Sequence, residues 1–106
     1  MFYKRDDTGY RTPAEGVRLK SLVHGEKAHL CEFRIDKGGR IPEHSHPHEQ
    51  TGYLVSGRIK FILKDEEFEA EPGDSWCLPG DVVHGAEVLE DSVMIEVFSP
   101  VREEYL

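Results

Sequence analysis

The sequence predicts an all-β fold in which a single domain forms a small antiparallel barrel or sandwich. Several segments alternate apolar and polar residues at every second position, the pattern of strands with one buried face. Turn signals rich in Gly, Pro and Asp separate these segments at intervals of about ten residues. No stretch carries the sustained periodicity of a capped helix. The 106 residues leave room for one domain, residues 1–106, with one core.

The charge balance excludes a general affinity for nucleic acid. Lys and Arg number 13 against 21 Asp and Glu, which gives a net charge of −8, whereas phosphate contacts need clustered Lys and Arg. Residues 1–7 lack an apolar signal segment, and no run approaches the roughly 18 apolar residues of a membrane span. We therefore expect a cytoplasmic protein without a membrane partner.

Cys31 and Cys77 lack the close spacing of metal ligands, so we expect reduced, buried thiols rather than a disulfide.

The N-terminal third has the weakest strand pattern. Residues 12–13 and 15–16, Thr-Pro and Glu-Gly, are typical of a loop. Residues 17–23 are compatible with an edge strand, and pairing of this edge with a second subunit would protect it from aggregation. We therefore expect a homodimer. His24 and His29 are expected to be ordinary surface or sheet residues.

Two segments in the middle of the chain, residues 31–35 and 58–64, show clear alternation. The acidic run 65–74 between later strands is most simply a solvated hairpin. Turns are predicted at residues 37–39, 56–57, 64–66, 71–74 and 79–81, where Gly, Pro, Ser or Asp cluster.

Residues 93–98 form the last predicted strand. Positions 93, 95 and 97 are Val or Ile and form an apolar face suited to packing between sheets. The opposite face holds Met94, Glu96 and Phe98. An acid and an aromatic ring on one face are compatible with the lining of a wet cavity, and equally with a solvent-facing strand on which Glu96 is exposed.

A histidine tract carries the strongest functional signal. His44, His46 and His48 stand at spacing two, so in an extended segment their side chains project to one side. His84 follows far downstream. Imidazole is the commonest transition-metal ligand, and several on one face can share an ion. The alternative is a His-rich surface loop, but the tract lies mid-chain between strand-like segments.

The residues around the tract extend this pattern into two motifs. Gly38, His44, His46, Gln50 and Gly57 give G-x5-H-x-H-x3-Q-x6-G, and Gly73, Pro79 and His84 give G-x5-P-x4-H. Together the motifs resemble those of the cupin superfamily, small β-barrels that hold a metal. The resemblance implies a double-stranded β-helix, or jelly-roll barrel, with its metal motifs within residues 38–85. Two positions depart from the usual pattern: Gln50 stands where many cupins have Glu, and Asp81 where the second motif usually has Gly.

The resemblance implies that a divalent ion binds between His44, His46, Gln50 and His84, with His48 at the rim. Imidazole and amide ligands suit Mn, Fe, Co, Ni, Cu or Zn, and four protein ligands leave two octahedral positions open. The alternative is a closed metal that only ties the barrel together. Because all four ligands are neutral, the ion keeps its full charge and favours an anionic partner such as a carboxylate-bearing small molecule.

The C-terminal segment 95–106 resembles a narrower group of cupins, the small enzymes of pectin and alginate breakdown that linearise unsaturated uronates. In that group an acid, a Phe and an Arg line the substrate site, and they correspond to Glu96, Phe98 and Arg102. The group typically carries Asp where this chain has Glu96. By this resemblance Glu96 and Arg102 are catalytic, and Phe98 and Arg102 bind substrate.

The sequence thus favours a metal-dependent enzyme that opens the ring of an unsaturated uronate or similar sugar acid. Two alternatives remain open at this point. One is a noncatalytic module that senses a sugar or a metal. The other is a cupin dioxygenase in which the metal activates oxygen.

Overall fold

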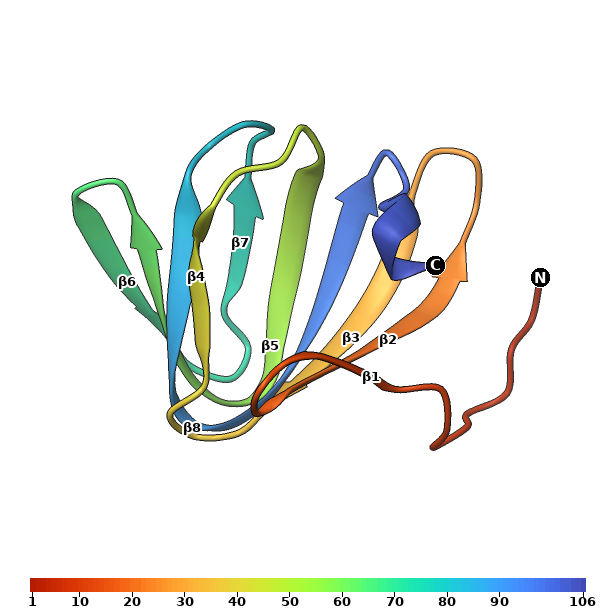
Figure 1. Ribbon diagram of the computed structural model, residues 1–106, viewed down its shortest axis with the longest axis horizontal. Coiled ribbons are helices and arrows are strands. Elements are labelled where there is room, and N and C mark those ends of the chain that lie inside the picture. Colours follow the sequence, from red (N-terminus) through yellow and green to blue (C-terminus); the bar gives the residue numbers. More distant parts are fainter.

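The computed structural model describes residues 1–106 and is almost entirely β (Figure 1). Its elements are β1 (Arg11–Ala14), β2 (Val17–His24), β3 (His29–Ile35), β4 (Arg40–His44), β5 (Glu49–Leu63), β6 (Glu66–Ala70), β7 (Ser75–Leu78), β8 (His84–Ser99) and the 3-10 helix η1 (Glu103–Tyr105). No helix in the structure has the length and apolar character needed to cross a membrane.

Two long strands organise the sheet. β5 spans 15 residues and β8 spans 16, and they pair with each other along most of their length. The first half of β8 also pairs with β4 and the second half with β3, while β5 pairs with β7 and then with β6. Every pairing is antiparallel, and the sheet curls into a jelly-roll barrel (Figure 1).

A bulge in β5 lets this strand bend. The register with β8 shifts between residues 54 and 59. Gly57 adopts a φ of 95°, and a Cβ there would lie 2.1 Å from Ser92 Oγ, so the bend needs glycine for both conformation and space. The turn predicted at residues 56–57 is therefore wrong: this glycine bends a continuous strand.

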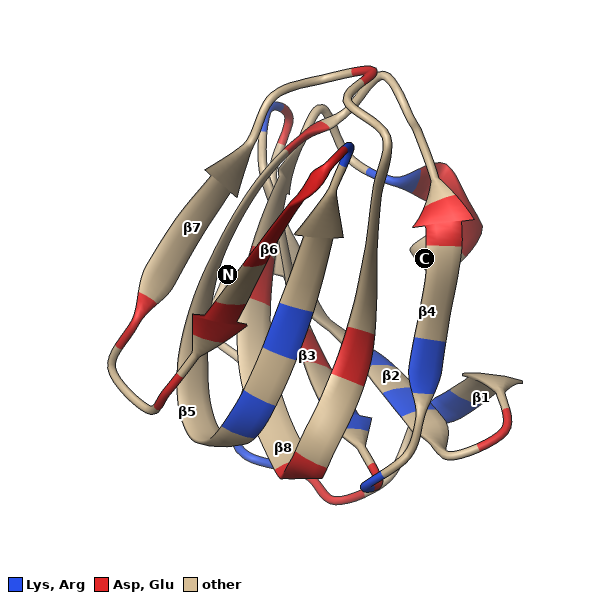
Figure 2. Ribbon diagram, turned by 90° about the vertical axis from the view of Figure 1, so that its left-hand side faces the viewer, with Lys and Arg blue, Asp and Glu red and all other residues tan.

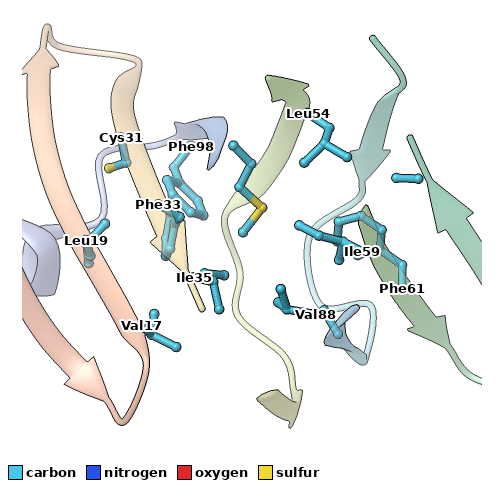
Figure 3. Packing of buried hydrophobic residues seen from close by; sticks show 13 residues of the cluster. Val17, Leu19, Cys31, Phe33, Ile35, Leu54, Ile59, Phe61, Val88 and Phe98 are labelled. Atoms are coloured by element: carbon cyan, nitrogen blue, oxygen red, sulfur yellow. The ribbon is translucent and has the colours of Figure 1, made fainter. Parts of the chain in front are cut away.

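The barrel interior is filled by one cluster of 13 buried apolar residues, many of them from β2, β3, β5 and β8 (Figure 3). Along β3 the odd-numbered residues are buried and the even-numbered ones half-exposed, which confirms the alternation predicted for residues 31–35. Both cysteines are free thiols. Cys31 is buried as expected, but the expected burial of Cys77 is wrong because its side of β7 faces outward.

Two strand assignments need correction. The expected loop at residues 12–13 belongs to β1, which pairs with β2 at Val17 and Leu19. The predicted edge at residues 17–23 is therefore covered at its start, and β1 leaves the rest of it without a strand partner. In β8 the predicted packing role of residues 93, 95 and 97 is also wrong. They are half-exposed on the outside, and the face carrying Glu96 is the buried one.

The remaining predicted turns are present. Turns occur at residues 37–38, 64–65, 72–73 and 80–81, and the acidic hairpin around β6 is exposed (Figure 2). Asp81 adopts a φ of 67°, the left-handed conformation for which glycine is the usual residue. Its short polar side chain tolerates that conformation, so the substitution of Asp for Gly leaves the turn intact.

Candidate metal centre and active site

Three histidine rings converge at one end of the barrel. His44 ends β4, His84 begins β8, and these two residues are paired in the antiparallel register. His46 lies in the connection that follows β4. The ring centroids are 4.4 Å apart for His44 and His84, 5.0 Å for His46 and His84 and 5.5 Å for His44 and His46. One nitrogen from each ring lies within 4.8 Å of the others, a spacing compatible with a shared ion.

Each ring is held by its Nδ1 atom. In His44, His46 and His84 the Nδ1–H donates to a backbone carbonyl oxygen two positions away, at 2.8, 3.0 and 2.9 Å. Such bonds fix the tautomer and turn the Nε2 lone pair toward a metal. The Nε2 atom of His84 is buried and has no hydrogen-bond partner. An orphaned acceptor in a buried site is costly unless a ligand satisfies it.

Gln50 places a side-chain oxygen, a candidate metal ligand, beside this group. Its Oε1 lies 3.1 Å from Nε2 of His46, and its side chain is buried. Because His46 carries its hydrogen on Nδ1, both facing atoms are acceptors. Two lone pairs that point at each other are stabilised by a cation between them. The donor set of three imidazoles and one amide oxygen therefore fits a divalent transition metal.

Burial keeps the rings of His46 and His84 neutral. Burial, helped by the nearby positive charge of Arg102, lowers the pKa of His46 to about 4. Burial is also the main cause of the lowered pKa of His84. A neutral imidazole is the form that binds metal, so the site is ready to bind at neutral pH.

His48 is not part of the cluster that His44, His46 and His84 form. Its ring nitrogens lie outside the group of ligand atoms formed by His44, His46 and His84. What it contributes is its backbone carbonyl oxygen, which accepts the hydrogen bond from His46. The Nδ1 of His48 is buried without a partner.

Glu96 is a fully buried acid on β8. The indole N–H of Trp76 donates to both of its carboxyl oxygens, at 3.1 and 3.2 Å. Burial raises the pKa of Glu96 to about 8, although hydrogen bonds from Gln50 and Trp76 act in the opposite direction. At neutral pH the group therefore carries a proton that it can donate. The solvent-exposed alternative for Glu96 is wrong.

Phe98 and Arg102 lie together beside the histidines. The Phe98 ring is 6.0 Å from the ring of His46, and the guanidinium of Arg102 stacks 5.0 Å over Phe98 and 4.1 Å over Tyr105. Oε1 of Glu104 accepts from Nε and one terminal nitrogen of Arg102, at 2.8 and 2.6 Å. These contacts hold the positively charged side chain of Arg102, a residue that is only 8% exposed.

His29 holds the backbone of Arg102 through a hydrogen bond. It is fully buried on β3, its Nδ1 accepts a 3.3 Å hydrogen bond from the backbone N–H of Arg102, and its Nε2 lies 2.6 Å from Ser21 Oγ. Burial lowers the pKa of His29. It is a sheet residue, as expected, but its contact with the tail was not foreseen, because it depends on two segments 73 positions apart.

A cavity of about 140 Å³ joins these groups. Apolar side chains from several strands form much of its wall, and its polar lining is Arg40, His44, Gln50, His84, Glu96 and Arg102, with Phe98 and Tyr105 among its aromatic residues. Possible metal ligands, a proton donor and a guanidinium thus share one small chamber.

Trp76, which holds the acid, and Gly52, which lies opposite it, were missed by the sequence analysis. The one available signal was a glycine inside an alternating strand.

Comparison with known proteins assigns the family. The cupin domain family matches residues 31–99, most of the chain. The chain belongs to the cupin family. It is 25% identical over 107 residues to the pectin degradation protein KdgF of Dickeya dadantii (strain 3937), with 99% of this chain and 97% of that protein covered.

Solved structures give the same fold. KdgF from a Halomonas species superposes with a TM-score of 0.93 at 31% identity, with 100% of both chains covered. An RmlC-like cupin from Shewanella frigidimarina gives 0.92 at 27% identity, covering 99% of this chain and 95% of that one. The polyketide cyclase RemF of Streptomyces resistomycificus gives 0.81 at 23% identity, covering 97% and 82%, a likeness of fold alone. The predicted cupin barrel is confirmed.

Replacing His44, His46 or His84 by Ala is expected to remove most of the bound metal, because the loss of one ligand lowers both affinity and geometric fit. His48→Ala should keep most of it, because the backbone carbonyl that holds His46 remains. Metal analysis of protein purified without a His tag measures both. An empty site in His48→Ala together with a full site in Gln50→Ala would contradict the ligand set.

The pKa of Glu96 predicts a pH effect on stability. Its ordinary value of 4.5 applies to the unfolded chain and about 8 to the folded one. Between these values the folded state holds the proton that the unfolded state has lost, so the contribution of Glu96 to stability falls as pH rises, by up to about 1.4 kcal/mol per pH unit. The lowered pKa of His46 acts in the opposite direction below about pH 6.5, but it is common to the wild type and Glu96→Gln. The free energy of unfolding of the metal-free wild type, relative to that of Glu96→Gln, should therefore fall as pH rises across this window. Parallel curves for both proteins would refute the raised pKa.

Proposed function

We propose that this chain is a metal-dependent enzyme that opens the ring of an unsaturated uronate or similar sugar acid. The observation that carries the proposal is the fully buried carboxyl of Glu96 in the same cavity as His44, His84 and Arg102. Burial raises its pKa to about 8, which favours the protonated form at neutral pH. The full-length similarity to two KdgF proteins, one of them described as a pectin degradation protein, supports this substrate class.

His44, His46, Gln50 and His84 are the residues that would hold the metal. When bound, a divalent ion supplies Lewis acidity and a template for the oxygen atoms of the substrate. Because all four ligands are neutral, its charge is not offset by the protein and favours a carboxylate. The donor set suits Mn, Fe, Co, Ni, Cu or Zn.

Glu96 supplies the proton in this mechanism. A 4,5-unsaturated uronate has a ring enol ether and a hemiacetal. Opening of the hemiacetal breaks the bond between the ring oxygen and the anomeric carbon and leaves an aldehyde and an enol. Conversion of the enol to the ketone requires a proton at the alkene carbon that does not bear the oxygen. Glu96 delivers that proton and regains one from the enol hydroxyl, so the reaction is an isomerisation.

Arg102 and Phe98 orient the substrate. A guanidinium has five N–H donors, and Glu104 occupies only those on Nε and one terminal nitrogen. The donors that remain can bind a substrate carboxylate in a planar arrangement. Phe98 forms an apolar wall against which a sugar ring can pack.

The two alternatives make different demands on the site. A noncatalytic sensor has no need of a buried carboxyl that holds its proton, so Glu96 favours the enzyme. A cupin dioxygenase would consume oxygen in step with substrate, and an oxygen electrode distinguishes it from a ring-opening enzyme, which consumes none.

We further propose that the chain acts as a cytoplasmic homodimer. Its two free thiols are compatible with a reducing compartment. The outer face of β5 and β8 offers an apolar surface for a second copy: Tyr53 and Val55 are 50% and 49% exposed, and Val93, Ile95 and Val97 on the neighbouring strand are half-exposed. This face replaces the strand edge that the sequence suggested. Light scattering tests it, and a monomer at all concentrations would rule it out.

Glu96→Gln is expected to retain metal and to lose turnover by about 100-fold or more, the scale of a missing general acid–base group. The amide has the same size but cannot transfer the proton. Loss of ultraviolet absorbance from the unsaturated uronate measures the rate. Full activity in the metal-loaded variant would remove Glu96 from the mechanism.

The charge of the site predicts a preference for acids. A uronate should bind better than the matching neutral sugar in calorimetric titrations of metal-loaded protein. Arg102→Lys should weaken that preference even though the charge is kept, because Lys lacks the planar fork. Equal affinities for acid and neutral sugar would exclude the anion site and favour the sensor.

A further inference from the structure

We propose that Trp76 is a positioning residue that acts across Gly52 to hold the Glu96 carboxyl group at the point from which it delivers its proton. This inference rests on the proposed function for its catalytic consequence. The contact itself is independent of any substrate.

The three residues lie side by side on neighbouring strands. Gly52 on β5 is paired with Trp76 on β7 and, on its other side, with Glu96 on β8. The indole N–H therefore crosses one whole strand to reach the acid. Its distances to the two carboxyl oxygens, 3.1 and 3.2 Å, are nearly equal. A donor shared in this way fixes both the position and the rotation of the carboxyl group.

Gly52 is required by space rather than by backbone conformation. It is not among the glycines with positive φ. A Cβ at this position would lie 2.2 Å from Nε1 of Trp76 and 2.5 Å from Oε2 of Glu96. Any side chain would thus occupy the path of the hydrogen bond, and both partners would have to move.

The length of the acid completes the set. An Asp at position 96 would be one methylene shorter than Glu, which removes roughly 1.5 Å of reach. An Asp carboxyl retracted by that amount would lie beyond hydrogen-bond distance of the indole. Glu96, Gly52 and Trp76 therefore depend on one another, and a shorter acid would leave Trp76 without its acceptor.

Trp76 is itself held in place and shields the acid. Its ring packs on Phe61 with centroids 4.5 Å apart. Trp76 lines a groove next to β6 and β7 and does not line the cavity, whereas Glu96 lines the cavity and not that groove. Trp76→Phe should keep this apolar packing and remove only the N–H donor, so it is the single substitution that best isolates the hydrogen bond to Glu96.

The contact can be observed without substrate, because Trp76 is the one tryptophan of the chain. A protein labelled with nitrogen-15 gives one indole N–H signal. In the wild type we expect this signal to exchange slowly with water. In Glu96→Asp it should change its chemical shift and exchange faster. An indole signal that is the same in both proteins would overturn the proposal.

A double-mutant cycle tests the consequence for catalysis. Trp76→Phe should lower kcat by about 10- to 100-fold, the scale of a displaced catalytic group, with KM and bound metal unchanged. In the Glu96→Asp background the same substitution should cost less than about 2-fold, because the contact is already absent. Equal losses in the two backgrounds, or a rise in KM without a fall in kcat, would overturn the positioning role.

Gly52→Ala provides a second route to the same contact. It should displace the indole and reproduce the kcat loss of Trp76→Phe, while Gly25→Ala, where no atom lies within 4 Å of the added Cβ, should retain the rate. If no unsaturated uronate is converted by the wild type, the proposed function fails, and the nuclear magnetic resonance comparison alone still decides whether Trp76 holds Glu96.

Discussion

The carboxyl group of Glu96 inside the barrel is the constraint on which the rest of the site depends. A charged carboxylate without compensation is among the costliest groups to bury, and a protein meets the cost by supplying donors or by keeping the group protonated. Both occur here, because Trp76 donates to both oxygens while burial raises the pKa to about 8. The arrangement in turn needs a side-chain-free residue between them, which Gly52 provides.

The same control of charge extends to the metal centre. Burial and the neighbouring Arg102 keep His46 neutral, and backbone carbonyls hold the imidazole hydrogens on Nδ1. The charge of Arg102 is partly balanced by Glu104 at the solvent side. A protein with a net charge of −8 thereby presents a chamber whose fixed charge is positive, so attraction of an anion depends on local geometry rather than on overall charge.

Much of the fold and part of the site could be predicted from sequence. Alternation predicts the β-strands, and the resemblance of the two histidine motifs to those of cupins implies the barrel and the proximity of His44, His46 and His84. Alternation alone could not say which face of β8 is interior, so Glu96 stayed undecided until burial was known. The contact of Trp76 with Glu96 depends on the register of three strands, which no local pattern specifies.

The shared fold with a polyketide cyclase at 23% identity shows that the barrel does not determine the chemistry, so function must be argued from side chains. Gln50 is the side chain that connects the histidine cluster with the buried acid Glu96. Its Oε1 faces His46, and the same side chain stabilises the charged form of Glu96. A Glu at position 50, as in many cupins, would place a second carboxyl group beside the buried one and raise the pKa of Glu96 further. The neutral amide of Gln50 avoids that negative charge and lowers the pKa of Glu96 instead. The departure of the chain from the usual motif at Gln50 thus leaves the buried acid better able to release its proton.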